Sequence, residues 1–506
     1  MMINRTKLKT LLSLFALNSI TLYLYFSSHD ADHIRHNSPA SPRSHPSETR
    51  YNQSHSPPFR TKPWPILPSY LPWSQSPDVA LRSCEAYFGN GFTRRLDLLA
   101  PSDGGWFRCF HSETLQSSVC EGGRVRMSPD KIKMSKGGEK LEMVMGRGEE
   151  EEMPVFESGA FDIRVSDPSK SGKKVVPQGS IGEYTMRELI DSILFSGAED
   201  FQCTEWIEEP TLLVTRFEYA NLFHTFTDWY SAYVASRVTG LPSRPHVVFV
   251  DGHCETQLEE TWKALFSSIR YAKNFSGPVC FRHVVLSPLG YETALFRGLS
   301  QNINCQGASA HELWQNPNDK RTARLHEFGE MVKAAFGFPV NRLNNPLKPV
   351  SGHNILFVRR EDYFAHPRHS GKVQSRLSNE EEVFNSVKNW VASSSSSSSS
   401  SRQLKCKVNV VNGLFAHMSM KEQVRAIQDA SIIVGAHGAG LTHIISAMPR
   451  TVVLEIVSSE YRRPHFALIA QWKGLEYHPI FLDGSHANPP VVTDKLRSIL
   501  KNSFEC

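Results

Sequence analysis

The stretch SIIVGAHGAGLTHIISAM (residues 431–448) joins a β-branched run to an apolar segment through a turn with three glycines. The β-branched run favours a strand, and the apolar segment predicts a helix after it. Gly435, Gly438 and Gly440 therefore remove three side chains where strand becomes helix. Exposed backbone N–H groups and the helix dipole would make this turn an anion site. A tight turn needed only for strand–helix packing is the alternative explanation.

The segments around this turn predict the fold class. Short β-branched runs alternate with helical stretches such as MKEQVRAIQDA, and this alternation predicts an α/β fold with parallel sheets and crossover helices. The predicted strands are residues 211–217, 246–252, 354–360, 407–411, 431–438 and 451–457. The charged residues 124–174 predict a solvated hairpin region. Nine consecutive serines at residues 393–401 predict a surface loop.

Charged side chains close several of the predicted strands. Arg359 and Arg360 end the run NILFVRR, where guanidinium groups can bind phosphate bidentately or form a surface salt bridge. Arg376 follows in SRLSNEEE, which predicts a helix start near the same edge. Glu455, in LEIV, could accept hydrogen bonds from ribose hydroxyls or form an ordinary ion pair. Since ligands bind at the carboxyl ends of strands in such folds, these residues and the glycine turn predict a diphosphate site.

The segment NLFHTFTDWYSAYVASRV (residues 221–238) predicts a helix with a candidate catalytic base. His224 and Asp228 are four residues apart and share one helix face. An imidazole beside a carboxylate is typical of a general base that is oriented by its partner. A hydrogen-bonded core helix with a surface histidine is the alternative. Asp251, which ends the run HVVFVD, is a rival carboxylate.

The N-terminus predicts a membrane anchor. TLLSLFALNSITLYLYF (residues 10–26) is uncharged, basic residues precede it, and no Lys or Arg follows until Arg35. The run is longer than a signal-peptide core and lacks a small-residue cleavage pattern. We expect a cytosolic tail at residues 1–9, an uncleaved transmembrane signal anchor at 10–28 and a lumenal stem at 29–77.

A lumenal location agrees with other features of the chain. All nine cysteines follow the predicted anchor, so we expect disulfides, with at least one thiol left over because nine is odd. Asn52 and Asn274 are glycosylation acceptors. The net charge of +5 is too small to indicate nucleic acid as a partner. The one Asp-x-Asp pair lies in the stem, so the sequence implies no metal site and no obligatory cofactor.

A diphosphate site, a candidate base and a lumenal location together indicate transfer from a nucleotide sugar. Such a displacement needs a base for the acceptor hydroxyl and positive charge for the departing diphosphate. Arginines and a helix N-terminus can supply that charge. We therefore expect two Rossmann-like domains facing a cleft.

Four segments, from about residue 84 to near the C-terminus, resemble the plant β-1,2-xylosyltransferases of glycosyltransferase family 61. They are SCEAYFGNGFTRRLDLL, EYANLFHTFTDWYSAYVASRV, LFVRREDYFAHPRHSGKVQSRLSNEEEV and GAHGAGLTHIISAMP. The resemblance implies an inverting enzyme with a GT-B-like fold. We place its N-terminal acceptor-side domain at residues 78–345 and its C-terminal nucleotide-sugar domain at 346–506.

The same resemblance implies a reaction and a location. Xylose would pass from UDP-xylose, in β-1,2 linkage, to the core β-mannose of N-glycans on glycoproteins. The enzyme would be a single-pass type II protein of the Golgi membrane with a lumenal catalytic domain. By motif, the diphosphate would be held by Arg359, Arg360, Gly438, Ala439 and Gly440, while His224 and Asp228 would lie on the acceptor side.

Three alternatives remain open from the sequence. Another family 61 enzyme could use UDP-arabinose or UDP-GlcNAc on a polysaccharide or protein. A nucleotide-dependent oxidoreductase would need a different glycine order and a suitably spaced acidic residue. A non-catalytic membrane protein could bind glycans without releasing UDP.

Overall fold

The computed structural model describes residues 61–67, 92, 94–101, 104–112, 115–181, 186–300, 325–340, 352–361, 366–368, 372, 376–396 and 404–506. The predicted cytosolic tail and anchor, and all of the predicted stem except residues 61–67, lie outside these ranges. Across the described ranges, no helix is both long enough and apolar enough to cross a membrane. Phe59–Cys506 forms one compact unit.

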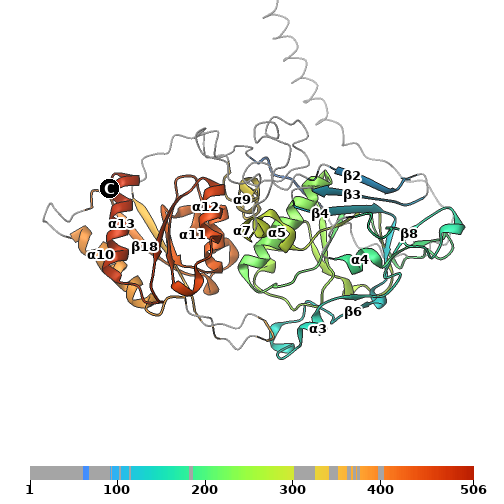
Figure 1. The fold of residues 1–506 in the computed structure, drawn as a ribbon, viewed down its shortest axis with the longest axis horizontal. Coiled ribbons are helices and arrows are strands. Elements are labelled where there is room, and N and C mark those ends of the chain that lie inside the picture. The colour runs from blue at the N-terminus through green and yellow to red at the C-terminus, as the bar shows by residue number, and fades with distance from the viewer. Residues whose placement is uncertain are drawn as a thin grey trace, which may run out of the picture. The chain divides into compact units, whose positions relative to one another are not determined.

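A five-stranded parallel sheet forms the C-terminal part of this unit (Figure 1). Its strands run in the order β18-β17-β19-β20-β21. In that order their bounds are Val408–Leu414, His353–Arg359, Ile432–Ala436, Val452–Val457 and Glu476–Phe481. Every neighbouring pair is parallel. The four predicted strands and their parallel pairing are therefore confirmed, and β21 is an additional strand that the sequence did not predict.

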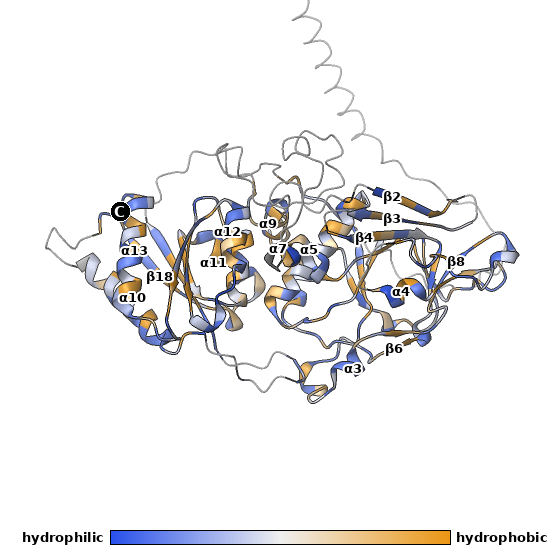
Figure 2. Cartoon of the chain, in the orientation of Figure 1, coloured by the Kyte–Doolittle hydropathy of each residue, from blue (hydrophilic) through white to orange (hydrophobic). Residues whose placement is uncertain are grey.

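Helices cover both faces of this sheet. α10 (Glu380–Ser396) and α13 (Pro489–Phe504) pack on the face that carries Ile355 and Phe357. Leu356 and Val358 point to the opposite face because side chains alternate along a strand. That second face is covered by the helices α11 (Met420–Asp429), η12 (Ala439–Ser446) and α12 (His465–Lys473). Figure 2 shows the apolar strands between polar outer helix surfaces.

The strand order reverses between β17 and β19. The chain passes from β17 to its neighbour β18 and then returns to the other side of β17 as β19. In open α/β sheets, ligands bind beyond the carboxyl ends of the strands at such a reversal. Arg360 follows β17 and Gly438 follows β19, so both lie at this point.

A seven-stranded mixed sheet forms the core of the N-terminal part. Its order is β14-β13-β11-β16-β4-β3-β2. In that order the bounds are Ile269–Tyr271, His246–Phe249, Thr211–Val214, Val284–Leu286, Ser117–Gly123, Trp106–Ser112 and Arg94–Leu99. The first four strands are parallel, and of these the sequence predicts β11 and β13 but not β14 or β16. The antiparallel strands β4, β3 and β2 extend the sheet and were not predicted.

A further five-stranded sheet shows that the prediction for residues 124–174 is wrong. Its order is β10-β15-β5-β8-β9. The bounds are Glu205–Ile207, Val279–Phe281, Val125–Met127, Phe161–Arg164 and Ile193–Ser196. The central strands β5 and β8 come from the supposed hairpin region, and their apolar side chains are buried. The apolar side chains of these two strands alternate with charged ones, and they pack into the core of this sheet.

The helix α5 (Leu222–Val238) lies at the centre of the unit (Figure 1). It begins where the Asn221 side chain accepts a hydrogen bond from Phe223 N, and this cap confirms the predicted helix. Nearly all of its side chains are buried, as expected for a helix packed on several sides. Its aromatic residues surround Phe328 of α9 (Leu325–Ala335). One hydrophobic cluster continues from α5 to β17 and β19.

The remaining elements are short. The helices are α3 (Glu149–Glu152), α4 (Arg187–Asp191), α6 (Glu259–Leu265) and α7 (Ala294–Ser300). The 3₁₀ turns besides η12 are η4 (Pro129–Lys131), η5 (Leu141–Met143), η6 (Pro168–Lys170), η7 (Ala272–Asn274), η8 (Gly290–Glu292), η11 (Phe415–His417) and η13 (Ser459–Tyr461). Two small antiparallel pairs are β1 (Lys62–Pro63) with β12 (Ser243–Arg244) and β6 (Ile132–Lys133) with β7 (Val155–Phe156).

The serine tract begins inside a helix. α10 continues to Ser396, and Ser394 is buried, so the loop prediction is wrong for residues 393–396. Serine is only a moderately poor helix former, and a helix already anchored by Val387 and Val391 can continue through it. Residues 397–403 lie outside the described ranges.

The predicted disulfides are present among the described cysteines. The bonded pairs are Cys109–Cys120, Cys203–Cys280 and Cys406–Cys506. Of the cysteines in the described ranges, Cys254 alone is unbonded, and it is buried. Cys84 and Cys305 lie outside those ranges.

The Cys406–Cys506 bond is expected to stabilise the C-terminal sheet and its helices. It closes a segment with a sequence separation of 100, and restricting the unfolded chain over such a length contributes roughly 2–5 kcal/mol. Cys406→Ser should lower the melting temperature by several degrees in calorimetry. Cys406→Ser combined with Cys506→Ser should lower it no further, since one bond is lost in both. An unchanged melting temperature would contradict this role.

Candidate functional site

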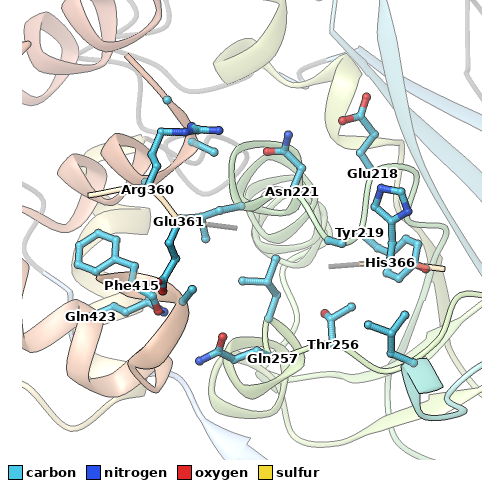
Figure 3. Close-up of a pocket in the computed structure, with 18 of the residues that line it drawn as sticks. Glu218, Tyr219, Asn221, Thr256, Gln257, Arg360, Glu361, His366, Phe415 and Gln423 are labelled. Atoms are coloured by element: carbon cyan, nitrogen blue, oxygen red, sulfur yellow. The ribbon is translucent and has the colours of Figure 1, made fainter. Parts of the chain in front are cut away.

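A cavity of about 1030 Å³ opens beyond the carboxyl ends of β17, β19 and β11 (Figure 3). Residues from the C-terminal part line one side: Val358, Arg359, Arg360, Glu361, Phe415, Ala416, Gln423, Ala436, Gly438, Ala439 and Gly440. His366 and Arg368 also line the cavity but reach the opposite side, where His366 lies beside Glu218 and Tyr219 (Figure 3). Residues from the N-terminal part line the other: Lys140, Leu141, Glu142, Glu149, Phe217, Glu218, Tyr219, Ala220, Asn221, Leu222, Glu255, Thr256, Gln257 and Leu258. Cavities of this size hold ligands as large as a nucleotide.

The three glycines of the opening stretch serve two purposes. A Cβ at Gly435 would lie 2.9 Å from the Val358 carbonyl oxygen, and one at Gly440 would lie 2.9 Å from Val358 Cγ1. Both glycines therefore allow β19 and η12 to pack closely on β17. A Cβ at Gly438 would instead collide with Nη1 of Arg360. Strand packing explains two of the glycines, and room for an arginine at the cavity explains the third.

The predicted arginine pair lies at the cavity wall. Glu380, the first residue of α10, supports both members through its carboxylate. Its Oε2 accepts a hydrogen bond from Arg360 N at 3.0 Å and lies 3.7 Å from Arg359 Nε. The Arg359 guanidinium also lies over the ring of Phe384 at 4.9 Å. Figure 3 shows Arg360 on the cavity side formed by the C-terminal part.

Arg376 lies beside this pair but does not line the cavity. Its guanidinium stacks on Tyr461, 3.2 Å from the ring centroid. Burial lowers the pKa of Arg376, and the nearby charge of Arg360 acts in the same direction. Its Nε and Nη1 are buried without a hydrogen-bond partner. Buried guanidinium donors beside a second arginine form a positive region that an anion would stabilise.

Glu455 lies beneath the glycine turn and is fully buried. One carboxylate oxygen lies 2.5 Å from His437 Nδ1, and the other accepts a hydrogen bond from the Tyr477 hydroxyl at 2.5 Å. A ribose hydroxyl would have to displace one of these partners to reach it. In this geometry Glu455 fixes the orientation of the His437 ring.

Asp228 is buried within α5 and does not line the cavity. Its Oδ1 accepts a hydrogen bond from Gly290 N at 3.0 Å, while Oδ2 is buried without a partner. Burial raises the pKa of this carboxyl to about 8, so Asp228 holds a proton at neutral pH. A protonated carboxyl anchors the turn at Gly290 but is a poor proton acceptor.

The His224 side chain projects from the first turn of α5 toward Glu218 at the cavity wall. Its Nε2 is 3.0 Å from an oxygen of Glu218, and its ring packs beside Tyr291 and Phe296. Burial lowers the pKa of His224, and the Glu218 charge opposes that shift only in part. His224 and Asp228 therefore share a helix but do not contact one shared group: His224 faces Glu218 and Asp228 faces η8.

Asp251, the rival carboxylate, belongs to a buried ion network. The Arg216 guanidinium donates to Asp251 Oδ1 at 2.7 Å and to Glu259 at 3.1 Å. Arg216 N donates to Asp251 Oδ2 at 2.9 Å. Burial alone would raise the pKa of Asp251, but the charge of Arg216 holds it below its usual value. This carboxylate is committed to holding the ends of β11 and β13 together.

Several cavity residues were not predicted from the sequence. Glu218 lies in the loop after β11, which ends at Val214, and its place directly after the predicted strand 211–217 was the available signal. Arg368 reaches Glu152, a buried residue of the N-terminal part, at 2.6 Å. Burial alone would raise the pKa of Glu152, but hydrogen bonds from His253 and Arg368 hold it below its usual value. No local pattern indicated this contact across the cavity.

Two other site predictions concern the periphery. Asn274, at the end of η7, is exposed, and Asn52 lies outside the described ranges. Within the part of the chain that the structure covers, no group of three or more His, Cys, Asp or Glu side chains forms a metal site.

Comparison with known proteins identifies the class of protein. The sequence model of the family described as glycosyltransferase 61 matches residues 211–454. This chain belongs to glycosyltransferase family 61. The matched segment includes both arginines of the pair and the whole glycine turn.

Individual relatives show which members of the family this chain is similar to. A β-1,2-xylosyltransferase of Arabidopsis thaliana is 58% identical, and the match covers 98% of each chain. A β-1,2-xylosyltransferase of Oryza sativa subsp. japonica is also 58% identical, over 89% of this chain and 84% of its own. An EGF domain-specific O-linked N-acetylglucosamine transferase of Gallus gallus is 26% identical over 56% of this chain and 47% of its own.

Substituting the glycines should separate their two purposes. Gly438→Ala should leave the melting temperature nearly unchanged, because the flexible Arg360 side chain can move, but should weaken UDP binding about tenfold in calorimetry. Gly435→Ala should lower the melting temperature, because its Cβ meets the backbone of β17. Gly484→Ala is the control, since a Cβ there meets no atom within 4 Å. Unchanged UDP affinity in Gly438→Ala would contradict the placement of Arg360 at the ligand.

Asp228 should make stability depend on pH in a defined direction. Its pKa is about 8 in the fold, above the value of about 4 in an unfolded chain. Its contribution is therefore complete below about pH 4 and is lost as pH rises to about 8. Asp228→Asn should remove this loss, so the difference in melting temperature between variant and wild type should rise from pH 5 to pH 8. A constant difference would show that the carboxyl is ionised in the fold.

Proposed function

We propose that this chain is an inverting glycosyltransferase that moves xylose from UDP-xylose, in β-1,2 linkage, to the core β-mannose of N-linked glycans. The carrying observation is the identity of 58% over 98% of both chains to a β-1,2-xylosyltransferase. The cavity agrees with that reaction, since it combines a positive wall with a wall rich in carboxylates and amides.

The C-terminal wall is proposed to hold the donor. Arg360 and the backbone of Gly438, Ala439 and Gly440 meet at the strand reversal, where nucleotide ligands bind in such sheets. The unpaired donors of Arg376 add positive charge behind this wall. When the bond between xylose and diphosphate breaks, the negative charge that develops on UDP would be stabilised there. Arg359 would act with Arg360 in the same role.

The wider arrangement is also part of the proposal. The parallel part of the seven-stranded sheet and the C-terminal sheet would form the two Rossmann-like domains of a GT-B fold. The N-terminal domain would bind the N-glycan, and the cavity between the sheets would be the active site. The predicted anchor at residues 10–28 would hold the enzyme in the Golgi membrane, with the catalytic unit in the lumen.

A panel of donors tests this function. The purified full-length chain in detergent should add one pentose to a GlcNAc-terminated N-glycopeptide from UDP-xylose, as read by product mass. UDP-arabinose and UDP-GlcNAc should give no product. Because arginines are proposed to stabilise the leaving group, activity should persist in EDTA.

Other outcomes of the panel would correct the proposal in defined ways. Transfer from UDP-GlcNAc alone would favour an activity like the one named for the Gallus gallus relative. Loss of activity in EDTA would keep the transferase and overturn the metal-free account. UDP binding without transfer to any acceptor would favour a glycan-binding protein.

A further inference from the structure

Glu218 is the carboxylate that the cavity holds in the most defined position. It follows β11, on the wall opposite Arg360, and its side chain is 46% exposed (Figure 3). The carboxylate can therefore meet a ligand in the cavity directly. The strand before it lies at the point where the parallel part of its sheet reverses order, between β13 and β16. This is the corresponding ligand position of the second sheet.

Two neighbours fix the Glu218 carboxylate from behind. His224 Nε2 lies 3.0 Å from Oε2, and the Tyr291 hydroxyl donates to Oε1 at 3.2 Å. Tyr291 belongs to the turn η8, whose first residue, Gly290, is anchored by Asp228. Both carboxylate oxygens are thus oriented, while the side chain keeps an exposed face. A reacting group held in this way needs little reorganisation when substrate binds.

Other carboxylates of the cavity are less suited to this role. Glu361 is on the arginine side and bonds to His417, and Glu255 forms an ion pair with Lys263. Glu142 and Glu149 are exposed residues of η5 and α3, and neither follows a strand of the large sheet. Glu218 alone among these five combines a place in the loop directly after β11, a two-point support and a position opposite Arg360.

We propose that Glu218 is the catalytic base, an assignment that rests on the proposed function. Its carboxylate takes the proton from the attacking hydroxyl of the acceptor sugar. The acceptor oxygen forms a bond to C1 of xylose as the bond from C1 to the diphosphate oxygen breaks. The electron pair of that bond leaves on UDP, next to Arg360. Glu218 then releases the proton to water, so the step needs no further reactant.

The buried neighbours of Glu218 support this assignment. Asp228 lies outside the cavity, and burial raises the pKa of its carboxyl to about 8, so it is already protonated. Burial lowers the pKa of His224, so its ring is neutral and donates one hydrogen bond to Glu218. His224 and Tyr291 are therefore positioning residues. His224 and Asp228, which the sequence predicts for the acceptor side, then act by positioning Glu218: His224 contacts it directly, and Asp228 anchors the turn that carries Tyr291.

The decisive variant is Glu218→Gln, which keeps the shape of the side chain but cannot accept the proton. Removing a general base lowers turnover about 10²–10⁴-fold. We expect that loss in kcat on the N-glycopeptide, with UDP affinity by calorimetry within twofold of wild type. Glu208→Gln is the matched control, because Glu208 is an exposed glutamate before the opposite end of the same strand, paired with Arg282. It should keep wild-type activity.

Rescue distinguishes a base from a structural residue. Sodium formate should restore part of the transfer in Glu218→Ala and should do nothing for wild type. Glu218→Gln with near wild-type kcat would overturn the assignment while the proposed function stands. Loss of UDP binding in Glu218→Gln, or no rescue by formate, would also overturn it. A wild-type protein that transfers no sugar would overturn the proposed function itself.

The positioning role of Tyr291 has its own readout. Tyr291→Phe removes the donor to Glu218 Oε1 and should lower kcat about tenfold, with the KM for donor unchanged. In the Glu218→Gln background the same change should have little further effect, because the two residues act as a unit. Additive losses in the double variant would show that Tyr291 acts elsewhere.

Discussion

The close approach of β17 and the chain that follows β19 is the constraint on which the site depends. Val358 leaves no room for a side chain at Gly435 or Gly440, so the two strand ends are held together over their last residues. This contact places Arg360 against Gly438 and brings residues 438–440 to the cavity wall. The reversal of strand order places the ends of β17 and β19 side by side, and the glycines allow them to pack closely. Both are needed to bring the Arg360 guanidinium against the glycine turn.

The charges of the molecule are divided according to what they do. Arg216, Asp251 and Glu259 form a buried, matched set, and the buried Glu152 is matched by the buried His253 and by the exposed Arg368. These groups lock loops at the ends of the N-terminal strands, and removing one partner of such a set leaves an uncompensated buried charge. Arg360 and Glu218 instead face the cavity from opposite sides. The supporting sets hold the walls, while Arg360 and Glu218 line the cavity where a ligand can reach them.

Much of the fold could be predicted because its signals are local. The helix α5 and the strands β17, β18, β19 and β20 each show a clear period or a run of β-branched residues, whereas β21 (EYHPIF) shows neither and was not predicted. The antiparallel strands β2–β4 and the sheet containing β5 and β8 were missed, since their short runs lie among charged and polar residues. The strands β2, β3 and β4 pair with near neighbours in sequence, but β4 and β5 also pair with β16 and β15, which lie far along the chain.

The site residues also separate into those that a local sequence signal predicts and those that it does not. Arg359, Arg360 and residues 438–440 line the cavity because strand ends and glycines carry position in the sequence itself. The burial of a side chain cannot be read from the local sequence. Glu218 and Asp228 are both acidic residues near the start of α5, but only the structure shows that Glu218 faces the cavity and Asp228 is enclosed. The same holds for Glu455, whose two hydrogen-bond partners come from separate strands and turns.

The position of α5 has a consequence for how the molecule responds to heat and to ligands. Its side chains belong to one hydrophobic cluster that also includes residues of β17, β19 and α11. Separating the two large sheets would therefore expose a core, not merely a polar seam. Domains joined in this way lack the independence of hinged lobes. The described unit should melt in a single cooperative transition, and donor and acceptor should meet a cleft whose width is already set.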